Sequence, residues 1–294
     1  MLNPQEIEAR KAAEAQEQQR QEEFSKARQL LTDLIALPEL EKVFDSEWRD
    51  HAKCVYQQVP TLTLLILQRL SGGLSLSGVV QEMLRHHRDI LPRNRRVEEG
   101  TLSENNSAYS RARQKLPLEN VKAFSTAICN HLAAQSKPVG LGRRVMILDG
   151  TTITLAPTPK LKEAFPPATN QHGESVWPVA RLMIASELST GCVLFPEIDP
   201  MYGQNNSSEP AQAERVIDRM PIEALVLADS NFGIFRLAYH CQLRGKEFVL
   251  RLTASRFKAL TRQGTLIEED PSHRTWHVIW SPSAKELKNN PHLT

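Results

Sequence analysis

Two aspartates, eighty positions apart (229 − 149 = 80), each follow a short apolar run. Asp149 comes after residues 145–148, is followed by a glycine, and precedes a β-branched segment that resumes at once. Asp229 comes after the apolar residues 224–228 and precedes a turn into an expected helix. Short apolar runs rich in β-branched residues predict buried strands. The sequence therefore predicts two strands that each present a carboxylate at the end.

A divalent cation would give these two carboxylates a chemical role. Burying an unpaired carboxylate costs several kcal/mol, so a carboxylate at the end of a buried strand needs a compensating partner. Mg²⁺ or Mn²⁺ suits oxygen ligands, keeps most of its waters and bridges to phosphate. Two such ions, about 4 Å apart, activate a water or a 3′-hydroxyl and stabilise the leaving oxygen in a displacement at phosphorus. We therefore predict that Asp149 and Asp229 are catalytic metal ligands.

Each aspartate also has a purely structural interpretation. Asp-Gly is the strongest short signal for a hairpin turn, which would make Asp149 a turn residue at a break in the strand. Asp229 precedes the helix expected near Phe232 and would then act as its N-terminal cap. Both alternatives stay open for either residue taken alone, whereas the repeated arrangement favours a metal site.

The chain from residue 140 onward alternates strands and helices. The expected elements are strands at 145–155, 179–187 and 192–198, a helix from Ser208 to Met220, a strand at 225–228, a helix at 232–243, a strand at 248–252 and a strand-like stretch at 265–279. The turn 189–191 would make the second and third strands a hairpin. Three strands followed by alternating helices and strands are the order of a ribonuclease H-like α/β fold. We expect residues 140–294 to form such a catalytic domain.

Helical patterns dominate the residues before the linker at 136–140. Residues 1–59 are expected to form a charged helical arm, because Glu, Gln, Arg, Lys and Ala prevail there. The alternative is an oligomerisation arm, which would make the protein a homodimer. Residues 60–136 are expected to form an all-α domain that binds DNA.

Two features of residues 60–136 are typical of DNA-binding domains. Helices at 60–70 and 76–84, joined by a glycine turn, resemble a helix-turn-helix, with an ordinary helical hairpin as the alternative. Residues 85–115 hold eight Arg or Lys residues against four acids, and Ser and Asn side chains at 103–110 add donors for phosphate oxygens. The predicted DNA contacts are Arg85, Arg88, Arg93, Arg95, Arg96, Arg111, Arg113 and Lys115.

Size and composition argue against several other classes of protein. The chain has 294 residues, 40% of them hydrophobic, which suffices for a sizeable core, and no apolar run approaches the length of a membrane span. The four cysteines have no paired spacing, so neither zinc nor a disulfide framework is expected. No secretory signal is recognisable, so we expect a bacterial cytoplasmic, nucleoid-associated protein without a membrane partner.

Several segments resemble the insertion-sequence-4-like family of DDE transposases. Residues 147–152 are similar to the family's first-aspartate strand, and Glu209 fits the start of the helix before the second aspartate. Residues 225–232 are similar to the second-aspartate motif, residues 245–251 to the strand after it, and residues 109–113 to the N-terminal region. The resemblance covers roughly residues 60–290. It implies a ribonuclease H-like fold, Mg²⁺ or Mn²⁺ at both aspartates, and DNA cleavage and joining at transposon ends.

The chain departs from the family pattern at two places. Ser230 and Asn231 stand where the family often has arginine or glycine after the second aspartate. No stretch matches the Tyr-x2-Arg-x3-Glu-x6-Lys pattern that carries the third acid, and neither Glu247 nor Glu286 is assigned that role. We therefore expect a transposase truncated before its third acid, with reduced or no activity. The alternatives are a DNA-binding regulator derived from a transposase and a different nuclease with the same fold.

Overall fold

The computed structural model describes residues 54–70, 73–139, 142–171, 173–291 and 293, together with scattered residues between 8 and 33. The scattered residues are helical, and most of the arm predicted at 1–59 lies outside the described residues. The chain divides into two compact units, Met1–Ile128 and Cys129–Thr294. Its described part is a mixed α/β structure, as the sequence predicts. Among the described residues, no helix is long and apolar enough to cross a membrane.

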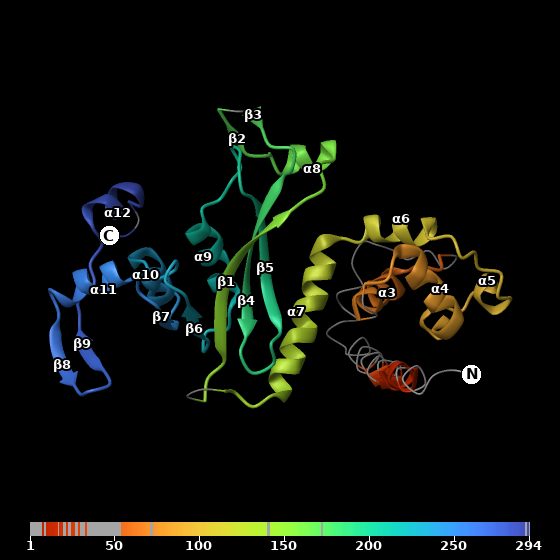
Figure 1. Ribbon diagram of the computed structural model, residues 1–294, viewed down its shortest axis with the longest axis horizontal. Helices are drawn as coiled ribbons and strands as arrows, with labels where there is room; N and C mark the ends of the chain where they lie inside the picture. The colour runs from red at the N-terminus through yellow and green to blue at the C-terminus, as the bar shows by residue number, and fades with distance from the viewer. Residues whose placement is uncertain are drawn as a thin grey trace. The chain divides into compact units, whose positions relative to one another are not determined.

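The described elements of the first unit are helices (Figure 1). They are α3 (Gln58–Leu70), α4 (Leu76–His86), the 3-10 helix η1 (Arg88–Ile90), α5 (Arg95–Glu98), α6 (Ser107–Lys115) and α7 (Leu118–Gln135), within which the boundary between the units falls. Ser75 caps α4 by accepting a hydrogen bond from the Gly78 amide, and Asn94 caps α5 by accepting one from the Val97 amide.

A small apolar core holds α3, α4 and α6 together. Leu64 and Leu67 on α3, Val80 and Met83 on α4, and Tyr109 on α6 are each at most 2% exposed. Within each of the first two helices the buried side chains recur three positions apart, which keeps them on one helix face. The helix pair predicted at 60–84 is therefore present, packed together with a third helix.

A five-stranded mixed sheet forms the centre of the second unit (Figure 1). Its order is β5 (Val193–Pro200), β4 (Val179–Glu187), β1 (Val145–Thr154), β6 (Leu225–Ala228) and β7 (Glu247–Leu250). β4 pairs antiparallel with both β5 and β1. On the other side of β1, β6 runs parallel to β1, and β7 runs parallel to β6. The parallel part places the carboxyl end of β6 beside the middle of β1, and the carboxyl end of β7 beside that of β6.

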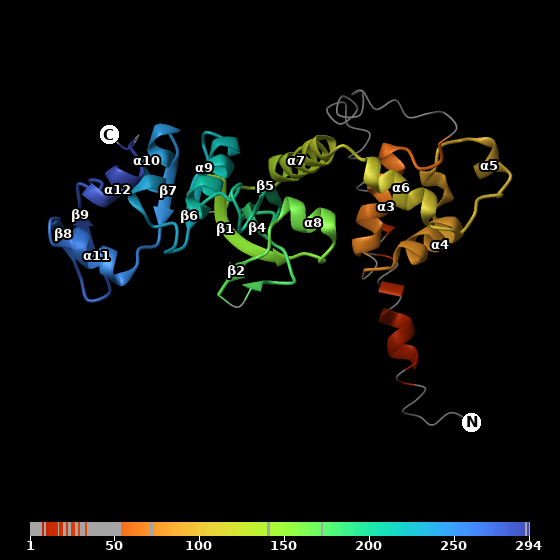
Figure 2. The ribbon, with the colours of Figure 1, turned by 90° about the horizontal axis from the view of Figure 1, so that it is seen from above.

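Helices α9 (Glu209–Arg219) and α10 (Phe235–Leu243) lie on the same side of this sheet (Figure 2). Met146 and Val226 on the strands share one fully buried core with Ile217 on α9 and Leu237 on α10. Each such side chain contributes about 1.5–3 kcal/mol relative to exposure, so this core fixes β1 and β6 against each other.

Smaller elements border the sheet. Between β1 and β4 lie α8 (Pro159–Ala164) and the short hairpin of β2 (Thr169–Asn170) and β3 (Gly173–Glu174). After β7 follow α11 (Ala254–Thr261), the hairpin of β8 (Thr265–Glu269) and β9 (Arg274–His277), and α12 (Ala284–Asn289). The capping box of Ser283 and Glu286 starts α12.

Several of these elements confirm the sequence predictions, and others correct them. The strands expected at 179–187 and 225–228 coincide with β4 and β6, and the turn at 189–191 joins β4 to β5. The strand expected at 145–155 is confirmed as β1, which stays paired with β4 to Thr154, so the alternative of a turn at Asp149 is excluded. The helix expected at 232–243 begins three residues later, at Phe235, because residues 229–233 form a turn.

Replacing Tyr109 by Phe should stabilise the helical unit. The Tyr109 hydroxyl is buried without a hydrogen-bond partner among the described residues, and such a group costs about 1–3 kcal/mol. Burial also raises the pKa of Tyr109 to about 12. The unfolded chain therefore loses this proton first, so the stability contributed by neutral Tyr109 is complete below about pH 10 and lost as the pH rises to about 12. Urea unfolding of both proteins at neutral and alkaline pH measures the effect.

The Tyr109→Phe protein should be at least as stable as the parent at neutral pH and should lose less stability at alkaline pH. Tyr109→Ala, which leaves a cavity, should lose about 3–5 kcal/mol. A loss of more than about 1 kcal/mol in Tyr109→Phe would show that the hydroxyl has a partner.

Candidate functional site

The register of β1 and β6 brings the two predicted aspartates together. Leu148 on β1 is the partner of Ala228 on β6, and the next residues along the two parallel strands are Asp149 and Asp229. Neighbouring strands lie about 4.8 Å apart. The two carboxylates therefore start from equivalent positions on adjacent strands, at one edge of the parallel part of the sheet.

The environment of both aspartates differs from the sequence-based argument. Asp149 and Asp229 are exposed, so the cost of burying a charge does not explain their presence. The structural alternatives also lose their basis. Asp149 lies within the continuous strand β1, and the residue before α10 that stands in the N-cap position is Ile234, not Asp229.

Hydrogen bonds from the local backbone orient both carboxylates. Asp149 Oδ1 accepts from the Gly150 amide at 2.8 Å, and Asp229 Oδ1 accepts from the Asn231 amide at 2.9 Å. Among the described residues neither carboxylate forms an ion pair, which leaves oxygen lone pairs on each for an external cation.

The turn after Asp229 is fixed by close packing against β7. Phe232 donates its amide to the Asp229 carbonyl at 3.2 Å, and its side chain is 3% exposed. A Cβ atom on Gly233 would lie 2.1 Å from the carbonyl oxygen of Arg251, so only glycine fits there. The direction of the chain that leaves Asp229 is therefore determined by the residue that follows β7.

Glu209, the first residue of α9, brings a third carboxylate near the pair. A Cβ atom on Gly150 would lie 3.0 Å from Glu209 Oε1, so this half-buried carboxylate lies directly beside the backbone next to Asp149. The sequence identified Glu209 only as part of the family resemblance. Its proximity to Gly150 depends on how α9 packs against β1 and β4, which no local pattern predicts.

The other two acids considered in the sequence are engaged elsewhere. Glu247 forms an ion pair with Arg143 at 2.8 Å, and Glu286 accepts hydrogen bonds from Ser283 in the capping box of α12. These contacts give both glutamates a structural role, in agreement with leaving them unassigned.

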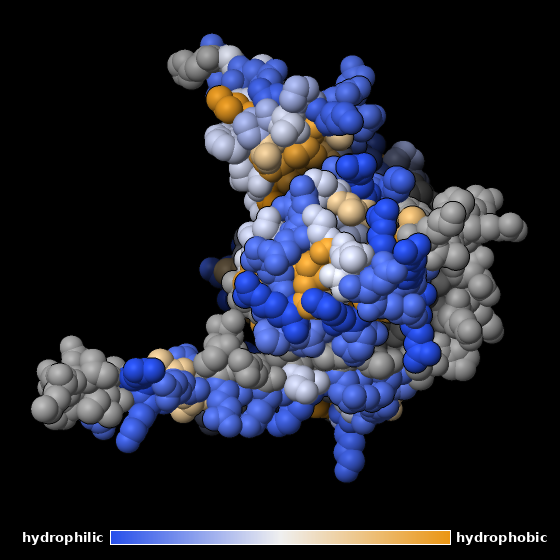
Figure 3. Space-filling model, turned by 90° about the vertical axis from the view of Figure 1, so that its right-hand side faces the viewer, coloured by the Kyte–Doolittle hydropathy of each residue, from blue (hydrophilic) through white to orange (hydrophobic). Residues whose placement is uncertain are grey.

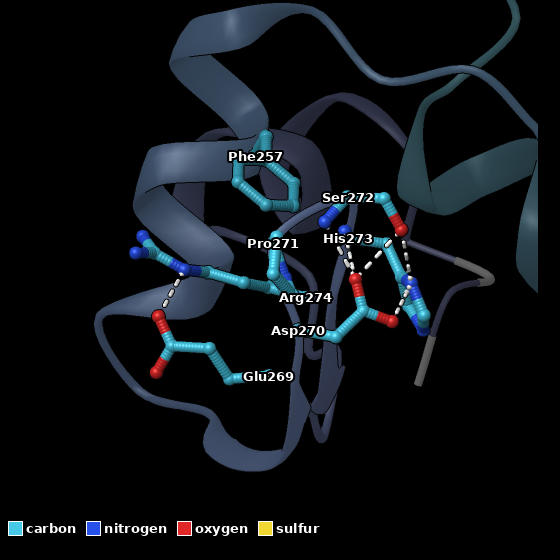
Figure 4. Close-up of a pocket in the computed structure, with 7 residues that line it drawn as sticks. All are labelled: Phe257, Glu269, Asp270, Pro271, Ser272, His273 and Arg274. Carbon is cyan, nitrogen blue, oxygen red and sulfur yellow. Dashed lines mark hydrogen bonds and ion pairs between the residues drawn. The ribbon is translucent and has the colours of Figure 1, made fainter.

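A separate group of possible ligands lies on the β8–β9 hairpin, and Figure 4 shows two of its members, Asp270 and His273. Among the described residues, Glu268, Asp270 and His273 are the one set of three whose ligand atoms all lie within 4.8 Å of one another, so Asp149, Asp229 and Glu209 do not form such a set. Asp270 Oδ1 accepts hydrogen bonds from Ser272 and from the His273 amide, and Oδ2 lies 2.5 Å from His273 Nδ1. The Ser272 side-chain and backbone hydrogen bonds lower the pKa of Asp270. These contacts make Asp270 the residue that stabilises the turn.

Two arginines join the aspartates at the same edge of the sheet. Leu250 on β7 is the partner of Ala228, so Arg251 stands in register with Asp229. Arg256 on α11 donates from a guanidinium nitrogen to the Ser230 carbonyl at 2.9 Å. The sequence argument overlooked both residues, because a pairing register and a helix contact bring them to this edge.

The predicted DNA contacts lie on the helical unit, distributed over α4, η1, the following loop, α5 and α6. Seven of the eight are exposed, and the eighth, Arg113, is half-buried over the Tyr109 ring. Arg95 pairs with Glu99 at 2.6 Å, and Arg88 donates to the Leu84 carbonyl. Figure 3 looks onto this unit, whose visible face is mostly hydrophilic around a small apolar area. Such a surface is compatible with binding a polyanion and does not by itself identify one.

Replacing Gly233 by Ala should displace the turn that carries Asp229. The added methyl group would overlap the Arg251 carbonyl at 2.1 Å, so the turn must move away from β7. We expect a lower melting temperature. We also expect at least a tenfold weaker affinity for Mn²⁺, because loss of the contacts that orient a metal ligand typically weakens metal affinity about 10- to 100-fold. Calorimetry measures both quantities. Gly191→Ala at the β4–β5 turn is the control: its φ of +69° makes alanine strained, so the variant should lose stability without displacing Asp229. Equal metal affinity in both variants would contradict the prediction.

Comparison with known proteins gives no family for this chain. No protein-family model matches it, and no curated protein is similar enough to match. The resemblance to insertion-sequence-4-like transposases therefore rests on the motifs around Asp149 and Asp229, and the function has to be argued from the geometry of the site.

Proposed function

We propose that this protein is a metal-dependent DNA phosphoryl-transfer protein of the transposase type, with Mg²⁺ or Mn²⁺ bound by Asp149 and Asp229. The observation that carries the proposal is the parallel register of β1 and β6, which sets the two aspartates side by side on adjacent strands. Both are exposed and form no ion pair among the described residues, so their charge is available to a cation.

The sheet topology supports a ribonuclease H-like core. Three antiparallel strands in the order β5, β4, β1 are extended by β6 and β7 parallel to β1, with α9 and α10 supplied by the intervening segments. The carboxyl ends of parallel strands are where α/β folds bind ligands. This topology agrees with the family resemblance at both aspartate motifs, and the transposase assignment is proposed on these two grounds together.

The donor set fits a hard divalent cation. Mg²⁺ binds through one or two carboxylates and keeps several waters, so two aspartates without a third close ligand are a suitable set. When bound, the cation would activate a water or 3′-hydroxyl and stabilise the oxygen that leaves phosphorus. The protein's own contribution is to hold Asp149 and Asp229 by their backbone hydrogen bonds and to fix the turn at Gly233. Glu209, whose carboxylate lies beside Gly150, would be available to a metal-bound water.

The helical unit would hold the DNA. Arg85, Arg96 and Arg111 are exposed and form no ion pair among the described residues, so they are available to phosphate oxygens. The proposed substrate is a pair of transposon ends, held by a homodimer. We expect such a protein to act at the nucleoid of a bacterial cytoplasm.

Replacing either aspartate by asparagine should abolish metal binding without unfolding the protein. Asparagine keeps the size of the side chain and removes the charge that a hard cation requires. We expect Asp149→Asn and Asp229→Asn each to weaken Mn²⁺ binding at least tenfold and to suppress any Mg²⁺-dependent DNA nicking. Titration calorimetry and a supercoiled-plasmid nicking assay measure the two effects.

Glu163→Gln is the matched control, because Glu163 is an exposed acid on α8 outside the site. Strand transfer by the parent chain is expected to be weak, since two carboxylates give a two-metal site less charge than three. Unchanged metal binding and nicking in both asparagine variants would refute the proposed function.

A DNA-binding protein without catalysis is the second candidate. The observation in its favour is that Asp149, Asp229 and Glu209 do not form a close set of three ligands among the described residues. Such a regulator would bind DNA with the same affinity in the presence of a chelator, whereas a transposase holds its DNA more tightly with the divalent cation bound. A gel-shift titration with and without chelator separates the two.

Replacing Arg85, Arg96 and Arg111 together by glutamine should weaken DNA binding and its salt dependence. Each phosphate contact contributes about 0.9 to the slope of log affinity against log salt, so the slope should fall by about 0.9 per arginine that contacts DNA. Fluorescence anisotropy with a labelled duplex at several salt concentrations measures it. Lys122→Gln is the control, because Lys122 on α7 pairs with Glu119 at 3.0 Å and is not one of the predicted DNA contacts. An unchanged slope in the triple variant would show that DNA binds elsewhere.

A further inference from the structure

Charges of both signs meet where the carboxyl ends of β6 and β7 lie in register with the middle of β1, without neutralising one another. Arg251 stands in register with Asp229, and Arg256 is bonded to the residue after it, yet no ion pair among the described residues joins these arginines to Asp149 or Asp229. Elsewhere in the unit several arginines do pair with acids.

The contrast is clear on α9 and α10. Arg236 on α10 binds Glu214 on α9 at 2.6 Å through a doubly hydrogen-bonded contact, and Arg219 binds Glu197 at 2.6 Å. A guanidinium and a carboxylate in contact form strong, often doubly hydrogen-bonded pairs. Unpaired charges of both signs at this edge leave the aspartates available to a metal ion and the arginines available to an anion.

Arg256 is the better positioned of the two arginines. Thr253 caps α11 by accepting a hydrogen bond from the Arg256 backbone amide, and this bond fixes the position of the Arg256 backbone. One guanidinium nitrogen donates to the Ser230 carbonyl at 2.9 Å, and the side chain is half-buried. A guanidinium group has five N–H donors, so this bond orients the group and leaves further donors for a second acceptor. Its fork geometry matches two oxygens of a phosphate.

We propose that Arg256 binds a non-bridging oxygen of the DNA phosphodiester at the Asp149–Asp229 edge, with the Ser230 carbonyl holding the guanidinium in the required orientation. The inference rests on the proposed function, because it takes that edge as the place where the phosphodiester reacts. It adds a phosphate-binding residue from the second unit to the DNA contacts predicted on the helical unit. Arg256 would act on the reacting strand, while the helical unit holds the flanking DNA.

A structural interpretation competes with this one. In that interpretation Arg256 only ties α11 to the turn at Ser230, and its charge plays no part in binding DNA. The two differ in the salt dependence of DNA affinity. A phosphate contact releases counterions and contributes about 0.9 to the slope of log affinity against log salt, whereas a structural tie contributes nothing to it.

The experiment compares Arg256→Gln, Arg256→Lys and the parent chain. The probe is a short fluorescent DNA duplex in the presence of Ca²⁺, a divalent cation with oxygen ligands like those of Mg²⁺. For Arg256→Gln we expect a slope smaller by about 0.9 and a several-fold loss of affinity, with Mn²⁺ affinity within twofold of the parent. Arg256→Lys keeps the charge and should keep the slope, with weaker binding because a lysine cannot bind two oxygens at once.

Arg274→Gln is the matched control, because Arg274 also lies in the second unit but pairs with Glu269 at 2.7 Å. The slope of log DNA affinity against log salt in this variant should equal that of the parent. An unchanged slope in Arg256→Gln, or a loss of Mn²⁺ affinity equal to its loss of DNA affinity, would overturn the inference in favour of the structural tie. If Arg256→Gln fails to fold, full DNA affinity in Arg256→Lys would overturn it instead.

The failure of this inference can be told from failure of the proposed function. If the Asp149→Asn and Asp229→Asn chains bind Mn²⁺ as the parent does, the metal site is refuted whatever Arg256 does. If those variants lose Mn²⁺ while Arg256→Gln keeps its slope, the metal site stands and only the role of Arg256 is refuted.

Discussion

The parallel pairing of β1 with β6 is the constraint on which the rest of the site depends. It makes Leu148 and Ala228 partners, so the next residue on each strand is an aspartate at the same edge. A shift of the register by one residue would move one aspartate along its strand and turn its side chain to the other face of the sheet. The buried side chains that α9 and α10 pack against Met146 and Val226 hold this register.

The same sheet edge explains why the turn after Asp229 is rigid and why charged groups accumulate beside it. Gly233 lets the turn approach the carbonyl of Arg251. Arg256 on α11 donates a hydrogen bond to the carbonyl of Ser230 in the same turn. A site built on a strand and a packed turn keeps its ligands in place better than a free loop does. The exposure of both aspartates then leaves them accessible to a cation and to a large substrate such as DNA.

Local patterns predicted the elements of this fold better than their arrangement. The strands at 179–187 and 225–228 were predictable, because each is an apolar run bounded by turn residues. The strand at 145–155 was predictable as well, and what the sequence left open was a turn at Asp-Gly, which β4 excludes by pairing with β1 on both sides of Gly150. The sequence identified the two aspartates as candidate ligands, but the expectation that they are buried was wrong, because both are exposed. Glu209 lies near Gly150 and Arg256 near Ser230 because helices distant in the sequence pack there. No short motif predicts such packing.

A crystal structure of the chain soaked with Mn²⁺ tests the central claim most directly, because anomalous scattering locates the ion without any assumption about activity. The account predicts an anomalous peak about 2.1 Å from a carboxylate oxygen of Asp149 and of Asp229, the distance expected for a hard divalent cation with oxygen ligands. A peak at Glu268, Asp270 and His273 with none between the two aspartates would contradict it.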